Sequence, residues 1–241
     1  PLLKHKDLNN FHAKYYHPSN SWFYTYGNLP LDGTLDFIDT KVLNRFNRLQ
    51  VNSKVPAQPR WESPKEASQA YAYDNKEDMD RKYQACVAWL IGDAKDSFEI
   101  LVMIILEQIL LGNPASPLTK ALIDSSLGTA LSDATGFSPD NRDTMFACGL
   151  RDIAEDSVKE VEKIIFSTLK NLVAKGIDQH LIDSAIHQIE FSRKEITNTP
   201  YPFGIKLLLG IAGALIHEGD PVSFINVDKD LEKLKKFLEK G

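Results

Sequence analysis

Residues 96–112 read DSFEILVMIILEQILLG, and this apolar segment opens the stretch from Asp96 to Gly149 around which the rest of the chain is organised. The apolar residues of the segment recur at spacings of three and four, which is the period of one helix face, and others continue round the back of the same helix. We therefore expect a core helix that is buried on most sides. The segment is shorter than the roughly twenty mostly apolar residues that span a bilayer, and Glu99, Glu107 and Gln108 interrupt it, so it does not predict a membrane helix.

Capping residues mark the ends of this helix and of the next one. Asp96 is of the type that accepts hydrogen bonds from the free N–H groups of a first turn, and Gly112 is expected just past the last turn. Ser116 followed by Pro117 predicts the start of a second helix, because proline lacks an N–H that a first turn leaves unpaired. Two strand-like segments follow Gly128, which we place in the left-handed conformation that ends the second helix.

The hydrophobic pattern on either side of this centre predicts further helices and strands. Arg81–Ile91 alternates as a strand does, and the aromatic residues 21–27 favour a strand as well. Ser157 with Glu160 is the pattern of a capping box that opens a long helix, and Gly176 closes that helix. Strands grouped with flanking helices predict an α+β domain with a largely antiparallel sheet. Helical patterns also occupy residues 7–16, 34–49, 178–189 with Asp178 as cap, and 229–240, and residues 203–216 form a further apolar segment.

The composition is that of a globular protein with one clear linker. Of the 241 residues, 43% are hydrophobic and 25% are charged, which is enough apolar material for a full core. The formal net charge of −5, with lysine and arginine dispersed, argues against a nucleic-acid partner. The sequence begins at Pro1 without methionine and shows no signal or transit peptide, so we expect a piece of a longer chain. Residues Gln50–Gln69 contain Pro56, Pro59 and Pro64 with little periodicity, which is typical of a linker.

Signatures of known catalytic centres are missing from the sequence. It holds no phosphate-binding loop and no nucleophile elbow. Cys86 and Cys148 lie in apolar, strand-like segments without metal-binding spacing, so we expect buried thiols and neither a disulfide framework nor a zinc ribbon. The sequence HQIEF that starts at His187 is one residue short of the zinc-peptidase motif H-x-x-E-H, because Phe191 stands where the second imidazole is needed. We therefore interpret His187 and Glu190 as part of a helix surface and expect no metal there.

The other histidines form no site that their spacing supports. His5, His12 and His17 lie close together in the chain, but only Asp7 accompanies them as a carboxylate, so metal binding is the weaker interpretation. His217 ends an apolar segment, where a cation interacts favourably with a helix dipole. No serine or cysteine has a base that spacing alone supplies. The sequence therefore assigns no catalytic, metal-binding or substrate-binding residue.

Three segments resemble a known peptidase family. Residues 11–20, FHAKYYHPSN, followed by residues 23–31, FYTYGNLPL, resemble the end of the catalytic domain in pitrilysin- and insulinase-like zinc peptidases, above all in the presequence-protease and falcilysin branch. Residues 113–128, NPASPLTKALIDSSLG, resemble the second domain of the same branch, and the tripeptide from Gly219 to Pro221 fits it as well. The resemblance extends over nearly the whole chain in the order of the family.

This resemblance implies a metallopeptidase-like fold of the LuxS and pitrilysin type and a division of the chain. Residues 1–50 are expected to be the tail of a preceding catalytic domain, residues 51–69 a linker, and residues 70–241 a second, non-catalytic domain. In the family the H-x-x-E-H motif precedes the segment at residues 11–20, and nothing here supplies it. The resemblance therefore implies zinc as the cofactor of a parent metalloendopeptidase, and neither a cofactor nor catalytic activity in this chain alone.

The function expected from the resemblance is a structural one. The domain would line a chamber for short unfolded peptides, such as cleaved targeting sequences. Its partners would be the catalytic domain, the C-terminal half of the parent chain and the peptides themselves, with no nucleic acid and no membrane. Many family members act in mitochondria or related organelles, although this sequence carries no targeting signal. The alternative is a separate non-catalytic subunit that scaffolds or presents peptides to an active partner.

The aromatic segment poses a packing problem if residues 1–50 belong to a preceding domain. A strand at Trp22–Tyr26 would have lost the sheet it joins, and exposed aromatic rings and an unpaired strand edge are both unfavourable in water. We therefore expect the segment to dock on helices of the second domain or to pair with a neighbouring chain.

Overall fold

The computed structural model describes residues 3–72 and 79–239, and the chain divides into two compact units. One helix, α7 (Phe203–Ile216), contains a boundary between them. The division into domains that the sequence suggests stays a prediction. Each unit joins two separate segments, which are Pro1–Pro56 with Asn198–Leu209 in what we call the first unit, and Ala57–Thr197 with Gly210–Gly241 in what we call the sheet unit.

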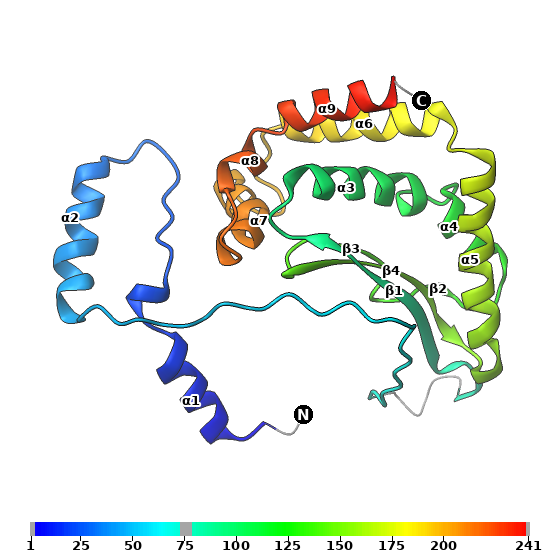
Figure 1. Ribbon diagram of the computed structural model, residues 1–241, viewed down its shortest axis with the longest axis horizontal. Coiled ribbons are helices and arrows are strands. Elements are labelled where there is room, and N and C mark those ends of the chain that lie inside the picture. The colour runs from blue at the N-terminus through cyan, green and yellow to red at the C-terminus, as the bar shows by residue number, and fades with distance from the viewer. Residues whose placement is uncertain (1–2, 73–78, 240–241) are drawn as a thin grey trace. The chain divides into compact units, whose positions relative to one another are not determined.

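The sheet unit is built on one antiparallel sheet (Figure 1). Its strands are β1 (Tyr83–Asp93), β2 (Ala130–Leu131), β3 (Gly136–Ser138) and β4 (Asp143–Ile153). Strand β4 lies in the middle, with β1 along one side and the short strands β2 and β3 along the other. Cross-strand pairs such as Trp89 with Phe146 set the register of the two long strands. The α+β class with a largely antiparallel sheet is confirmed, and so is the strand predicted at residues 81–91.

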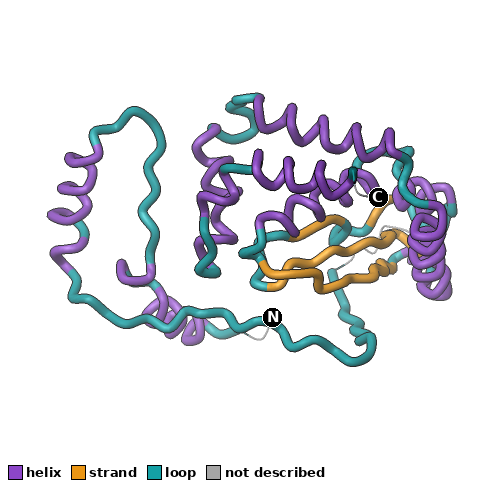
Figure 2. Tube along the Cα trace, turned by 45° about the horizontal axis from the view of Figure 1, so that its top comes forward, coloured by secondary structure: helices purple, strands orange, loops and turns teal. Residues whose placement is uncertain are grey.

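Helices of the sheet unit lie over its strands (Figure 2). They follow the predicted order along the chain, and the apolar segment at residues 203–216 is helical. Among the helices that the structure describes, none has the length and apolar character needed to cross a membrane. The helix predicted at residues 229–240 ends at Leu238, and residue 240 lies outside the described part. The helices are α3 (Ser97–Leu111), α4 (Pro117–Asp124), α5 (Val158–Lys175), α6 (Gln179–Lys194), α8 (Pro221–Ile225) and α9 (Asp228–Leu238), with 3-10 turns η3 (Met79–Arg81) and η4 (Glu155–Ser157).

Helix α3 is the core helix that its sequence predicts. The Asp96 carboxylate accepts a hydrogen bond from the Glu99 backbone N–H at 2.9 Å, and the helix ends before Gly112, as expected. Leu110 belongs to the cluster that packs on the sheet, whereas Leu101 belongs to a second cluster with α6 and α9. The helix is apolar around most of its circumference because it lies between these two layers.

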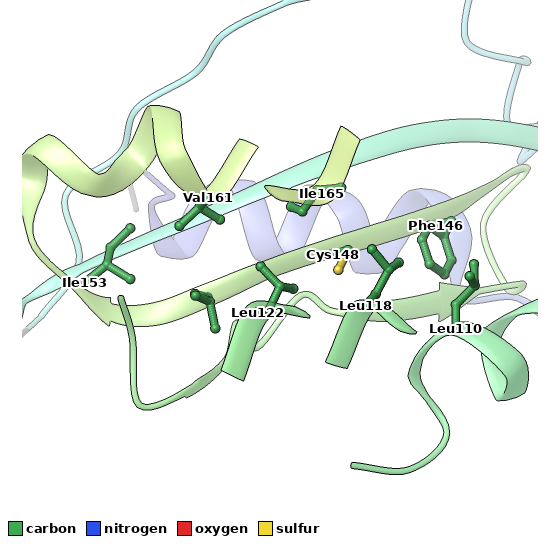
Figure 3. Close-up of a cluster of buried hydrophobic side chains, with 9 residues drawn as sticks. Leu110, Leu118, Leu122, Phe146, Cys148, Ile153, Val161 and Ile165 are labelled. Carbon is green, nitrogen blue, oxygen red and sulfur yellow. The ribbon is translucent and has the colours of Figure 1, made fainter. Parts of the chain in front are cut away.

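The main core lies between the sheet and the helices α4 and α5. Successive residues of a strand point to opposite faces, so Phe146, Cys148 and Leu150 of β4 share the face that the helices cover. Leu122 of α4 and Ile165 of α5 meet them and are completely buried. Figure 3 shows this cluster. Burying one such aliphatic side chain is worth about 1.5–3 kcal/mol relative to leaving it exposed, so the cluster holds the layers together.

Two predicted helix ends use different contacts from those expected. Asp178 caps α6 as predicted, since its carboxylate accepts a first-turn N–H at 2.8 Å, and Gly176 closes α5 with φ at +79°. Ser157 precedes α5, but the turn η4 leads directly into the helix and leaves Ser157 with helical dihedral angles and no capping bond. Ser116 precedes α4, and its hydroxyl accepts the Asn113 N–H at 3.2 Å. The predicted capping box at Ser157 is therefore wrong.

Gly128 does not adopt the left-handed conformation that its position after a helix suggests. Helix α4 stops at Asp124, and Ser126 takes the positive φ, at 57°. Gly128 lies shortly before β2, where an added Cβ atom would overlap the carbonyl oxygen of Arg151. The prediction of a left-handed Gly128 is therefore wrong, and the glycine is needed for space.

The first unit contains short helices without any buried residue. The helix predicted at residues 7–16 is confirmed. The helix predicted at residues 34–49 begins and ends earlier, and a 3-10 turn replaces its second half. The elements are α1 (His5–Tyr15), η1 (Pro18–Asn20), α2 (Leu31–Lys41) and η2 (Leu43–Arg45).

The aromatic residues 21–27 form no strand, contrary to the prediction. The described part of the first unit contains no strand with which they could pair. Instead they contact the first turn of α7, where the Tyr24 hydroxyl donates to the Gly204 carbonyl at 2.9 Å and the Tyr26 ring lies 5.9 Å from the Phe203 ring. The segment thus docks on a helix, but the contacted turn belongs to the first unit, so docking on the second domain and pairing with a neighbouring chain both stay predictions.

Candidate functional site

The sheet has a second face, opposite the main core, which we call the open face. It is defined by the residues that alternate with the core residues along the two long strands. On β1 these are Gln84, Cys86 and Ala88, all exposed, and on β4 they include Met145 and Arg151. Because the strands are paired, these side chains lie together on one face of the sheet.

The middle of the open face is built from small residues. Ala88 on β1 lies opposite Ala147 on β4, and Cys86 lies opposite Gly149. A Cβ atom added at Gly149 would overlap the carbonyl oxygen of Ala85, so the backbones approach each other too closely for any larger residue. Ala147 and Gly149 are buried, so the accessible part of this face lies along β1, where the side chains of Cys86 and Ala88 are small.

The two cysteines point to opposite faces of the sheet. Cys148 lies in the core, and burial raises the pKa of its thiol to about 12. The predicted buried thiol is confirmed for Cys148, but Cys86 is exposed on the open face, so the prediction is wrong for it. The apolar composition of β1 does not reveal that Cys86 is exposed, because only one face of an antiparallel strand needs to be covered.

The incomplete zinc motif lies on the surface of α6. His187 and Phe191 are exposed, as a helix surface requires. The Glu190 carboxylate pairs with the Lys235 ammonium of α9 at 2.7 Å. The hydrogen bond from Lys235 is the main cause that lowers the pKa of Glu190. Glu190 therefore joins two helices in this structure.

The N-terminal histidines each engage a different neighbour. Among the residues that the structure describes, no three His, Cys, Asp or Glu side chains are placed to hold a metal ion together. The donor set of a zinc peptidase therefore does not fit this part of the chain. The contacts are His5 with Asn9 at 3.4 Å, His12 stacked on Tyr16 with 4.6 Å between ring centroids, and His17 Nδ1 accepting the Ser19 N–H at 3.1 Å.

His217 follows the last residue of α7, which confirms the predicted helix end. Its side chain is buried, and its Nε2 lies 3.3 Å from the carbonyl oxygen of Asp140. Because a carbonyl oxygen only accepts, the ring N–H is the donor. His217 therefore ties the end of α7 to the loop that precedes β4.

Hollows occur in each unit, and none of the residues that define the open face lines them. One of about 620 Å³ lies between the start of α3 and α9, where the Lys233 ammonium lies 3.6 Å from the centre of the Phe98 ring. Another, of about 930 Å³, is formed in the first unit by residues 17–19, 43 and 46–51. The hollow between α3 and α9 offers cation–π and ionic contacts, whereas the hollow in the first unit is lined by a 3-10 turn and loop residues.

Comparison with known proteins points to one family. Residues 3–189 match the family described as the peptidase M16 inactive domain. The mitochondrial presequence protease of Mus musculus is 35% identical over 242 residues, covering 100% of this chain. Presequence protease 1 of Arabidopsis thaliana, described as chloroplastic/mitochondrial, is 31% identical over 245 residues. Protein HypA of Clostridium perfringens is 34% identical over 238 residues, covering 99% of this chain.

This chain spans less than a quarter of each of these relatives, namely 23%, 22% and 24% of their lengths. A solved structure, the inactive peptidase domain of a proposed zinc protease from Bordetella parapertussis, is similar with a TM-score of 0.50 at 14% identity. The similarity covers 62% of this chain and 75% of that one, and it shows the fold alone.

Proposed function

The chain belongs to the peptidase M16 inactive-domain family, and we propose that it forms a non-catalytic wall of the peptide chamber in a longer zinc metalloendopeptidase. The observation that carries this proposal is the identity of 35% along the whole chain to a presequence protease of which this chain spans 23%. In such a parent protein, the catalytic zinc and the residues that ligate it belong to another domain. The peptides cleaved there would be short and unfolded, such as targeting sequences after their removal.

The open face is the surface that we assign to the chamber. An unfolded peptide has no fixed shape, so a wall that holds it needs a broad surface without deep, selective pockets. The small, exposed side chains of Cys86 and Ala88 provide such a surface, and the exposed Gln84 adds hydrogen-bonding capacity. The opposite face is occupied by the helices of the core, whereas Gln84, Cys86 and Ala88 of β1 on the open face are exposed.

The partners of the domain follow from the same proposal. The catalytic domain and the C-terminal half of the parent chain would enclose the chamber together with this domain. A mitochondrial or related compartment is supported by the names of the relatives from Mus musculus and Arabidopsis thaliana, whereas the relative from Clostridium perfringens shows that the domain also occurs in a bacterium.

A bulky residue on the open face of the full-length parent protein tests the assignment. Ala88→Trp places a large ring in the middle of the open face, and we expect KM for a long unfolded peptide to change several-fold. Val173→Trp is the matched control, because Val173 is 87% exposed on the helix α5. Equal KM values for both variants and the unaltered enzyme would show that the open face does not meet the substrate.

The complete coding sequence separates this proposal from a separate scaffold subunit. A parent metalloendopeptidase requires an H-x-x-E-H motif upstream of residue 11. A reading frame that contains this domain without the motif would support a non-catalytic subunit that presents peptides to an active partner.

A further inference from the structure

Strand β1 is exposed on the side that does not face β4. It forms one end of the strand order, and in the described part of the chain it pairs with β4 alone. It is also the joint longest strand, with eleven residues. A long unpaired edge offers a row of N–H and C=O groups to any other extended chain, and proteins commonly block such edges.

The chain segment that begins at Gln58 is anchored by hydrogen bonds and an ion pair at the C-terminal end of β1. The Gln58 backbone N–H donates to Asp143 Oδ2 at 2.7 Å, and the Arg60 guanidinium pairs with Asp143 Oδ1 at 3.0 Å. Arg60 also donates to the carbonyl oxygen of Ile91 at 3.3 Å. The Asp143 side chain is only 11% exposed, so these bonds are partly shielded from water.

A further hydrogen bond anchors the same segment at the N-terminal end of β1. The Tyr71 hydroxyl donates to the carbonyl oxygen of Lys82, the residue before the strand. Strand geometry places Lys82 and Ile91 roughly 30 Å apart. Residues 60–71 reach at most about 40 Å when fully extended, so they are long enough to span the strand between these anchors.

Between its anchors the segment stays loosely attached. Residues 61–70 are all exposed and belong to no strand. Pro59 and Pro64 explain this, because a proline has no N–H to contribute to a ladder of hydrogen bonds. The segment is therefore anchored at the two ends of β1 without being a member of the sheet.

We propose that residues 58–71 form a detachable strap that shields β1 from pairing with β1 of a second copy of this chain and that the contact between Arg60 and Asp143 holds it closed. The proposal goes beyond the chamber wall and does not depend on it. The strap blocks an edge of the sheet that would otherwise be free to take up a further strand. Its release would convert that edge into a surface for strand addition.

Hydrogen exchange on the chain of 241 residues tests the strap. Arg60→Ala removes two contacts of the first anchor from an exposed side chain, so we expect the amides of β1 to exchange about tenfold faster. Lys163→Ala is the matched control, because it also removes one cation and one ion pair, that with Glu160 at 3.2 Å, but on the helix α5. Tyr71→Phe should act as Arg60→Ala does, since it releases the second anchor.

Self-association provides the second readout. We expect sedimentation analysis of the Arg60→Ala chain to show a dimer that grows with protein concentration, with the Lys163→Ala chain behaving as the unaltered chain does. The proposal is overturned if β1 exchanges equally fast in the Arg60→Ala and unaltered chains. It is also overturned if Lys163→Ala has the same effect, or if the Arg60→Ala chain associates no more than the unaltered chain.

Discussion

Gly128 shows that the sequence can mark a position where glycine is required without revealing why it is required. A glycine after a predicted helix suggests a left-handed helix end, but Ser126 takes that conformation here. At Gly128 the constraint comes from Arg151, whose carbonyl oxygen occupies the space that a Cβ atom would need. The two residues are neighbours because β2 pairs with β4, so only the folded sheet reveals the constraint.

Replacing Gly128 by a larger residue should destabilise the sheet unit. For Gly128→Val we expect a loss of about 1–3 kcal/mol in the free energy of unfolding, because the backbone of β4 must move to admit the side chain. Gly210→Ala is the control, since a Cβ there meets nothing within 4 Å and alanine favours a helix by up to about 1 kcal/mol. Denaturant unfolding of both variants measures the difference, and equal stability of the Gly128→Val and unaltered chains would contradict the steric argument.

At the scale of secondary structure, helix ends also show that a residue type in the sequence does not determine the contact that the residue makes. Asp178 and Ser157 both stand before helices and both belong to the residue types that cap them. Only Asp178 makes the bond, because Ser157 continues a 3-10 turn that already has helical dihedral angles. A capping residue in the sequence therefore marks where a helix starts, whereas the path of the preceding chain decides whether its side chain stabilises that start.

This difference predicts unequal effects of two similar substitutions. Asp178→Ala should lower the free energy of unfolding by about 0.5–2 kcal/mol, because it leaves a first-turn N–H without its partner. Ser157→Ala should change it by less than about 0.5 kcal/mol, because no capping bond is lost. Thermal unfolding at equal protein concentration measures both, and a larger loss at Ser157 would mean that its hydroxyl caps the helix in solution.

At the scale of the whole molecule, the two units differ in how they bury apolar residues. The sheet unit has two clusters of buried side chains, whereas the helices α1 and α2 of the first unit bury none. Large rings such as Phe11, Trp22 and Phe37 are more than half exposed. Ordering a chain costs about 1–2 kcal/mol per residue, and apolar burial is the main term that offsets this cost. The described part of the first unit thus lacks the core that usually stabilises a domain.

We therefore expect unequal protection of the two units in solution. In the chain of 241 residues, the amides of α1 and α2 should exchange on the order of 100-fold faster than those of α3 and β4. Hydrogen exchange followed by mass spectrometry measures this directly. Equal protection of α1 and α3 would show that the first unit is stabilised by contacts other than those described here.

The sequence by itself determined those features whose physical cause is local. The period of the apolar residues identified α3 and β1, and the side chains of Asp96 and Asp178 identified helix starts, because these signals act within a turn or a strand. The antiparallel α+β class followed from the order of such elements. The same local reasoning failed at residues 21–27, whose aromatic composition favours a strand, although the described part of the first unit offers no strand to pair with it.

The tertiary structure alone decided which of these residues meet. It placed Cys86 on the open face and Cys148 in the core, although both lie in similar apolar strands. It brought Arg60 to Asp143 across a long separation in the chain. These outcomes depend on the pairing of β1 with β4 and on the face that the helices cover. Contacts between distant residues form only when the whole sheet unit is assembled, so no local pattern records them.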